Sequence, residues 1–159
     1  MFKIKLLILL LITSFFYSCT ELKKNNNKYK IKYIPGGIDG HIFSNNIRNS
    51  FEKLGIYSDQ EDLIIDINLN HSRDLYITNI DNTSNREKIT STVNLKIVDV
   101  NGCALFNKIY ITSQFYVITS SQSFLSNSSA INDIKFQNGM EIINKIIPDL
   151  IYYEYSCNE

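Results

Sequence analysis

Neither sign of charge predominates in this chain, because 16 basic residues balance 16 acidic residues over its 159 positions. Removal of residues 1–18 would take away Lys3 and Lys5 and leave the remainder slightly acidic. Nucleic-acid-binding domains are normally basic, so the composition argues against that class of partner. Charged residues make up 20% and hydrophobic residues 44% of the chain, which excludes wholesale disorder and a polytopic membrane protein.

The spacings of residue types that mark common catalytic and metal sites are also missing. The two histidines, His41 and His71, form no HxH or HxxxH pair and have no CxxC beside them, so a metal site has little support. Neither a glycine-rich phosphate-binding motif nor GxSxG occurs. Solvation explains the carboxylates Glu61, Asp62 and Asp66 as well as catalysis does. We therefore expect no cofactor and no enzymatic activity, with an exported enzyme as a minor alternative.

The amino-terminal hydrophobic run, Leu6 to Tyr17, is shorter than the roughly 20 residues that a spanning helix needs. Two lysines precede it and a polar segment follows, which is typical of an export signal. Phe16-Tyr17-Ser18-Cys19 resembles the bacterial lipobox, although Phe16 stands where Leu is usual. Residues 1–18 are therefore predicted to be a lipoprotein signal peptide, and Cys19 is predicted to carry the lipid that anchors the protein to a membrane. A retained anchor, and cleavage near Ser18 with a free Cys19, are the alternatives.

The rest of the chain is long enough for one ordinary domain. Residues 19–28 comprise Cys19 and a polar segment without apolar periodicity, which is expected of a tether. We expect residues 29–159 to form a single domain.

Four segments of this domain have apolar residues at every second position, the period of a half-buried strand. Two of them lie within residues 88–119 and flank Asn101-Gly102, which favours a two-residue hairpin turn because both residues tolerate positive φ. The other two are residues 29–33 and residues 62–77, the latter with an expected break at 70–73.

Two further segments have apolar residues at helical spacing. We expect Asp39 to cap the first, which ends at Gly55, and Ser129 to cap the second, in which Pro148 should introduce a kink or the end. The order β-α-β-β-β-α predicts an α+β two-layer sandwich, with a four-stranded mixed sheet and two helices packed on one face.

The strand after Asn101-Gly102 is apolar on both faces. One face carries Leu105, Ile109, Ile111, Phe115 and Val117, and the other carries Phe106, Tyr110, Tyr116 and Ile118. One face of a two-layer protein should be solvated, so the aromatic face, with Phe106, Tyr110 and Tyr116, is a candidate partner interface. The alternative is that these aromatic residues simply lie on a solvated strand.

Basic residues are grouped in sequence around the middle strands: Arg73, Arg86, Lys88 and Lys96. They could bind phosphate groups, or they could form the solvated face of the sheet.

The layout, together with three local patterns, resembles the LptE family of lipopolysaccharide-assembly lipoproteins over residues 29–153. The patterns are Asn85-Arg86-Glu87-Lys88 leading into Thr92-Val93-Asn94, the turn at 98–102, and a closing helix with Ile146-Ile147-Pro148. The chain departs from the family at Thr20-Glu21-Leu22, where a Gly-aromatic stretch often follows the lipidated cysteine.

The resemblance implies a lipoprotein on the periplasmic side of the outer membrane that plugs the large β-barrel LptD and assists lipopolysaccharide assembly. It also implies lipopolysaccharide contact by basic residues, which we place at Arg86 and, by proximity, at Lys88 and Arg73. Thr20, rather than Asp, follows Cys19 and favours outer-membrane sorting. The alternative is a lipoprotein of similar fold that serves as a binding module in another envelope complex.

Cys103 and Cys157 remain once Cys19 is lipidated. The strand after Cys103 and the returning helix bring Cys157 back within reach, so the two thiols are a possible disulfide in an oxidising compartment. Such a bond would close a loop of about 54 residues. A frayed terminus would instead leave both thiols free.

Overall fold

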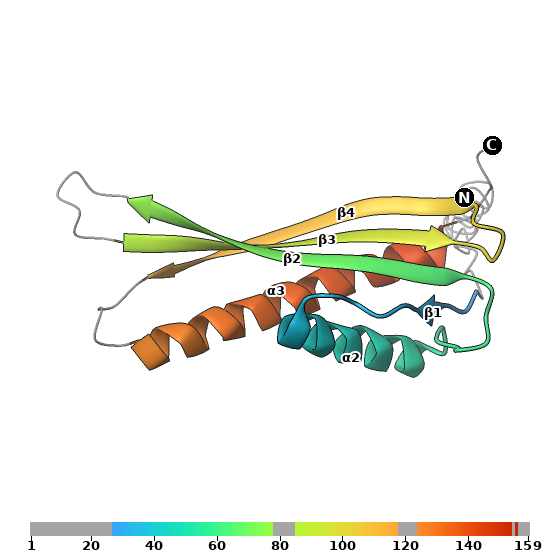
Figure 1. Cartoon of the computed structure of the whole chain (residues 1–159), viewed down its shortest axis with the longest axis horizontal. Helices are drawn as coiled ribbons and strands as arrows, with labels where there is room; N and C mark the ends of the chain where they lie inside the picture. The colour runs from blue at the N-terminus through green and yellow to red at the C-terminus, as the bar shows by residue number, and fades with distance from the viewer. Residues whose placement is uncertain (1–26, 78–84, 118–123, 154, 156–159) are drawn as a thin grey trace, which may run out of the picture.

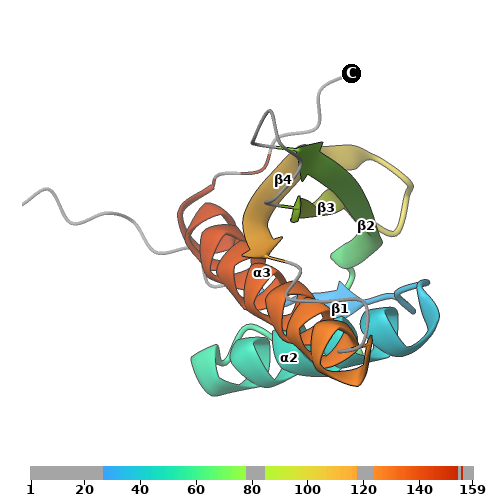
Figure 2. The ribbon, with the colours of Figure 1, turned by 90° about the vertical axis from the view of Figure 1, so that its left-hand side faces the viewer.

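The computed structural model describes residues 27–77, 85–117, 124–153 and 155. The predicted signal peptide, Cys19 and most of the tether lie outside this part. The described residues form an α+β domain, with both helices on one face of a four-stranded mixed sheet (Figures 1 and 2), which confirms the predicted fold class. Its elements are β1 (Lys30–Ile31), α2 (Gly37–Leu54), β2 (Ile64–Ile77), β3 (Asn85–Val98), β4 (Ala104–Val117) and α3 (Phe124–Tyr152).

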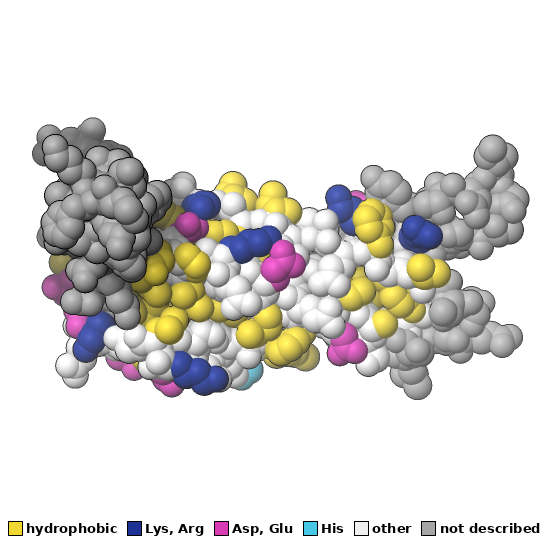
Figure 3. All heavy atoms as spheres, turned by 180° about the vertical axis from the view of Figure 1, so that it is seen from behind, with side chains coloured by type: hydrophobic (Ala, Val, Ile, Leu, Met, Phe, Trp, Pro, Cys, Tyr) yellow, Lys and Arg dark blue, Asp and Glu magenta, His cyan; other side chains and the backbone are white. Residues whose placement is uncertain are grey.

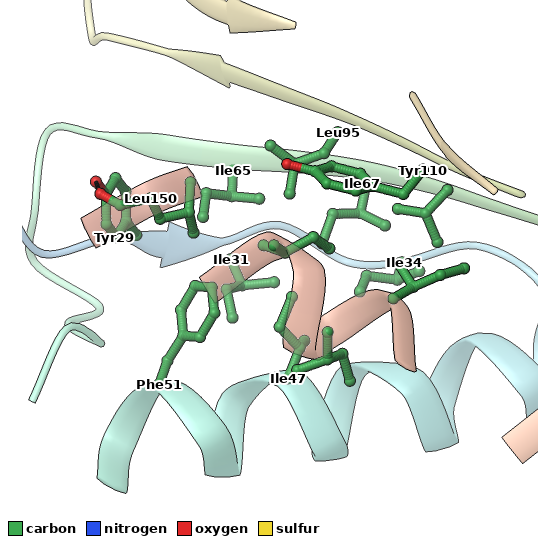
Figure 4. Close-up of a cluster of buried hydrophobic side chains, with 14 of the residues drawn as sticks. Tyr29, Ile31, Ile34, Ile47, Phe51, Ile65, Ile67, Leu95, Tyr110 and Leu150 are labelled. Atoms are coloured by element: carbon green, nitrogen blue, oxygen red, sulfur yellow. Dashed lines mark hydrogen bonds between the residues drawn. The ribbon is translucent and has the colours of Figure 1, made fainter. Parts of the chain in front are cut away.

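The sheet has the order β1-β2-β3-β4, with β1 parallel to β2 and the other neighbours antiparallel. The short β1 lies between β2 and α2 (Figure 4), whereas the three long strands extend well beyond α2 (Figure 1). The expected break at 70–73 is wrong, because Asn70 lies opposite Thr92 and Arg73 opposite Ile89 in continuous register. Polar side chains do not interrupt backbone pairing when each has a solvent-facing or hydrogen-bonded position.

The core lies between the sheet and the helices (Figure 4), as the strand periodicity predicts. Alternate side chains of β2 and β3 point into it and meet apolar residues of both helices. These buried residues include Ile65, Ile67, Val93, Leu95 and Ile97 from the strands, Ile47 and Phe51 from α2, and Ile142, Ile143 and Ile146 from α3.

The helix ends differ in part from expectation. The N-cap of α2 is Gly36, at φ 123°, with no side-chain cap, so the prediction that Asp39 caps this helix is wrong. Asp39 lies within the first turn of α2, where its carboxylate forms an ion pair with Lys135 on α3 at 2.7 Å. The predicted stop is confirmed: Gly55 adopts φ 71°, and its N–H donates to the Glu52 carbonyl.

Helix α3 begins at Phe124, five residues before the expected Ser129 cap, and it continues through Pro148 to Tyr152. Pro148 has no backbone N–H, so the helix lacks one hydrogen bond at this position. Ile146 and Leu150, on either side of Pro148, are both buried in the core. Their packing holds the last turn in place. Within the described residues, neither helix combines the length and the apolar character needed to cross a bilayer.

The turn between β3 and β4 lies where Asn101-Gly102 predicts it, but it is longer than a two-residue hairpin. Residues 99–103 connect the strands, Gly102 has φ 83°, and its N–H donates to the Asp99 carbonyl at 3.1 Å. The Asp99 carboxylate also accepts the Cys103 N–H at 2.7 Å. Asp99 therefore organises the wider loop.

Candidate partner and ligand surfaces

The aromatic face of β4 packs against α3, so the prediction of Phe106 and Tyr110 as partner-interface residues is wrong. Phe106 is 9% exposed and Tyr110 is 4% exposed. The Tyr110 hydroxyl donates to the Asp149 carboxylate at 2.6 Å, and burial together with that carboxylate raises the Tyr110 pKa. Tyr116, the third predicted interface residue, hydrogen-bonds Asn127 on α3. Phe106 and Tyr110 therefore hold α3 on the sheet and are not presented to a partner. Tyr116 is half-buried, and its place in a partner interface stays a prediction.

The opposite face of β4 carries the exposed apolar surface. We call Ile109, Ile111, Phe115 and Val117 the β4 outer row; each is 50% to 59% exposed. Figure 3 shows hydrophobic side chains along the upper margin of the molecule, which is its sheet side. The sequence grouped these four residues on one face. In the register with β3, the buried residues Ile97 and Val93 lie opposite Phe106 and Tyr110, so these two residues of β4 share the helix-facing side. The β4 outer row therefore lies on the face away from the helices.

The three predicted lipopolysaccharide-binding residues do not share a face. Arg86 and Lys88 lie on the outer face of β3, opposite Val117 and Phe115 of the β4 outer row. Arg73 lies on the helix-facing side of β2, where its guanidinium donates twice to the Glu87 carboxylate, at 2.6 and 3.0 Å. The structure therefore brings Arg86 and Lys88 together and separates Arg73 from them.

A cleft of about 370 Å³ opens between the start of α2, the middle of β2 and α3. The Asp39–Lys135 ion pair, at 2.7 Å, lies in it, and His71 Nε2 lies 3.9 Å from the same carboxylate. Apolar side chains form most of the remaining wall: Ile38, Ile42, Phe43, Leu69 and Phe136. Periodicity gave no sign of this cleft, because Asp39 and Lys135 are far apart in the sequence.

A buried polar network continues from His71 into the sheet. His71 Nδ1 and Ser91 Oγ are 2.7 Å apart, and Asn138 Nδ2 donates to Ser91 Oγ and to the Ile89 carbonyl, each at 3.2 Å. Asn138 Oδ1 accepts from Gln114 Nε2 at 3.0 Å. Asp39, His71 and Ser91 are the residue types of a hydrolase triad, but Ser91 is 0% exposed and no substrate can reach its hydroxyl in this arrangement. The network links β2, β3, β4 and α3.

Acidification should destabilise the protein through His71. Burial lowers the His71 pKa most strongly; Asp39 opposes this effect and Lys135 adds to it. The unfolded chain therefore binds a proton more readily than the folded protein, so we expect the free energy of unfolding to fall as the pH drops through the unfolded value of about 6.5. Urea unfolding of wild type and His71→Gln at pH 7.5 and 5.5 measures this effect, and the variant should lose less stability.

The matched control is His41→Gln on the exposed face of α2, which removes an imidazole that takes no part in the buried network. An identical loss of stability in wild type and His71→Gln would contradict the assignment to His71.

Several predicted sites lie wholly or partly outside the described residues. Cys19 and Cys157 belong to this group, whereas Cys103 is described and is disulfide-bonded. The lipidation of Cys19 and the pairing of Cys103 with Cys157 stay predictions. Among the residues that are described, no group of His, Cys, Asp and Glu has the geometry of a metal site.

No family model matches the chain, and no curated protein matches it significantly in sequence. Solved structures of bacterial lipoproteins do resemble it. The minor lipoprotein of Acinetobacter baumannii has a TM-score of 0.56 at 12% identity, over 82% of this chain and 98% of that one. For a presumed lipoprotein of Caulobacter crescentus CB15, the TM-score is 0.51 at 15% identity, over 77% and 86%. Rare lipoprotein B of Shewanella oneidensis gives 0.53 at 8% identity, over 78% and 95%. The chain therefore has the fold of these bacterial lipoproteins.

Proposed function

We propose that this protein is an outer-membrane lipoprotein, anchored through Cys19, that binds and plugs a large LptD-like β-barrel from the periplasmic side and assists lipopolysaccharide assembly. The lipobox-like segment supports the anchor. The fold shared with bacterial lipoproteins, rare lipoprotein B among them, supports the family resemblance.

The β4 outer row is the observation that carries the proposal. Four large apolar side chains are exposed along a single strand, on the sheet face that the helices leave uncovered. A row of exposed apolar side chains on a folded domain is typical of a protein interface, since its exposure to water is unfavourable. A plug inside a barrel would cover such a surface.

Arg86 and Lys88 add a chemical match to lipopolysaccharide. Arg86 lies opposite Val117 and Lys88 opposite Phe115, so two cationic side chains of β3 are neighbours of two apolar side chains of the β4 outer row. Lipopolysaccharide likewise presents phosphate groups next to acyl chains, and charge-assisted hydrogen bonds from Arg86 would suit the phosphates. Arg73 is a weaker candidate because Glu87 already holds its guanidinium.

Placing charge in the β4 outer row should disrupt binding to the barrel. We expect the double variant Ile111→Asp/Phe115→Asp to reduce co-purification of a large outer-membrane barrel with the tagged lipoprotein by about tenfold or more, because two carboxylates would be buried in an apolar interface. The measurement is quantitative mass spectrometry of detergent-solubilised outer membranes.

The control places the same two charges on β2 of the same face, as Asn68→Asp/Asn70→Asp; both positions are exposed. This control should recover the barrel at the wild-type level, and thermal unfolding should show that both variants are folded. Undiminished recovery with the β4 variant would contradict the proposed interface.

The cleft between α2 and α3 favours the second candidate, a lipoprotein that acts as a binding module in another envelope complex. Its volume of about 370 Å³ lies in the range of small-ligand sites, and its walls are mainly apolar with one ion pair. Wild-type lipoprotein that recovers no barrel from the membrane would favour this candidate.

A further inference from the structure

β4 is the last strand of the sheet within the described residues, and it has few of the features that protect an edge strand. It spans 14 residues, contains no proline, and carries Lys108 as its one charged residue. Its register with β3 is regular from Phe106 to Val117, with an irregularity between Ile97 and Val98 at the turn end. In natural proteins, charged side chains, prolines or β-bulges usually protect an edge strand against pairing with another chain. This edge is therefore suited to pairing with another strand.

The four residues of the β4 outer row are placed symmetrically about Ser113. An antiparallel pairing of two copies with Ser113 opposite Ser113 puts Ile109 opposite Val117 and Ile111 opposite Phe115, each pair twice. Every member of the β4 outer row then meets another member across the new strand pair. Cross-strand pairs of this kind stabilise antiparallel sheets.

The residues between them suit the same register. On the helix-facing side, Tyr110 would lie opposite Tyr116 and Thr112 opposite Gln114, so no like charges face each other. Glu141 and Lys145 of α3 form an ion pair at 2.7 Å, and both hydrogen-bond Thr112 beside the symmetry axis. In the dimer, α3 of each copy therefore places one Glu141–Lys145 ion pair near the symmetry axis, and the charges of each pair cancel.

We propose that two copies of this chain associate through β4, antiparallel and centred on Ser113, to form one continuous sheet. This inference is independent of the proposed barrel, and it concerns the lipoprotein when no barrel occupies the β4 outer row. The interface is isologous, which is the usual symmetry of homodimers.

Cysteine cross-linking tests the register directly. Directly opposed residues of antiparallel strands have Cα atoms about 4.5 to 5.5 Å apart, within the range of a disulfide. The variant Ser113→Cys in the full-length protein, purified in mild detergent without the barrel and mildly oxidised, should give a dimer on a non-reducing gel. Asn68→Cys, on the same sheet face but on β2, adds one thiol in the same way and should stay monomeric. We expect about tenfold or more dimer from Ser113→Cys than from Asn68→Cys.

Light scattering provides a second readout. The wild-type protein should have the mass of a dimer, and Ile111→Lys should have the mass of a monomer while unfolding at a similar temperature. Equal cross-linking of the two cysteine variants, or a monomeric wild type at high concentration, would overturn the proposal. Cross-linking of Ser113→Cys to a different protein would do the same, since the edge would then belong to another partner. Failure of the barrel experiment alone would leave these outcomes unchanged.

Discussion

Replacing Gly40 with alanine should destabilise the protein by about 3 kcal/mol, because the new methyl group would collide with backbone atoms. Gly40 lies in the first turn of α2, and a Cβ there would be 2.6 Å from the Pro35 carbonyl oxygen and 2.8 Å from that of Ile34. The strand-to-helix connection cannot move away easily, since Ile34 is buried in the core. Urea unfolding at pH 7.5 measures the loss.

Gly139→Ala is the matched control. Gly139 is a buried helical glycine on α3, but its Cβ would meet a side-chain atom, Phe43 Cδ2, at 3.3 Å. A phenyl ring can yield by a few tenths of an ångström, and alanine favours the helix by up to about 1 kcal/mol. We therefore expect the two effects to cancel to within about 1 kcal/mol. Equal stability of the two variants would show that the close approach at Gly40 is not a constraint.

Asn138→Leu should cost about 2 to 3 kcal/mol, although leucine has a similar volume. Asn138 is fully buried and donates to Ser91 and to the Ile89 carbonyl, while it accepts from Gln114. Leucine would leave these groups short of hydrogen bonds in a site that water does not reach. The same urea unfolding experiment measures the change.

Asn144→Leu provides the control, because Asn144 is an exposed residue of the same helix. It should change the free energy of unfolding by no more than about 0.5 kcal/mol. If Asn138→Leu were equally mild, the buried network would have no part in holding α3 on the sheet.

These two sites also explain how α2 and α3 are positioned for the cleft. Gly40 lets the start of α2 approach the chain after β1, and Asn138 holds the middle of α3 on β3 and β4. The ion pair between Asp39 and Lys135 then joins the two helices. The cleft depends on both close approaches, so either substitution should also alter its shape.

The sequence alone determined the features that depend on local periodicity and backbone conformation. The alternation of Ile89, Val93, Leu95 and Ile97 predicted a half-buried strand, and the structure buries all four. Gly55 and Gly102 predicted a helix end and a turn, and both adopt positive φ. Such signals are readable from sequence because side-chain direction repeats every two residues in a strand and because positive φ strongly favours glycine.

Which face of β4 is buried, and which residues meet in the cleft, depends on how the strands and helices pack together. Alternation could not predict which face of β4 is buried, because Ile109 and Tyr110 belong to two opposite faces that both carry apolar side chains. The choice follows from pairing with β3 and from the hydrogen bond of Tyr110 to Asp149 on α3. The cleft residues are likewise brought together by helix packing, a long-range effect that no local pattern encodes. For this reason the sequence predicted the fold class, whereas the structure was needed to place the surfaces on which the proposed function rests.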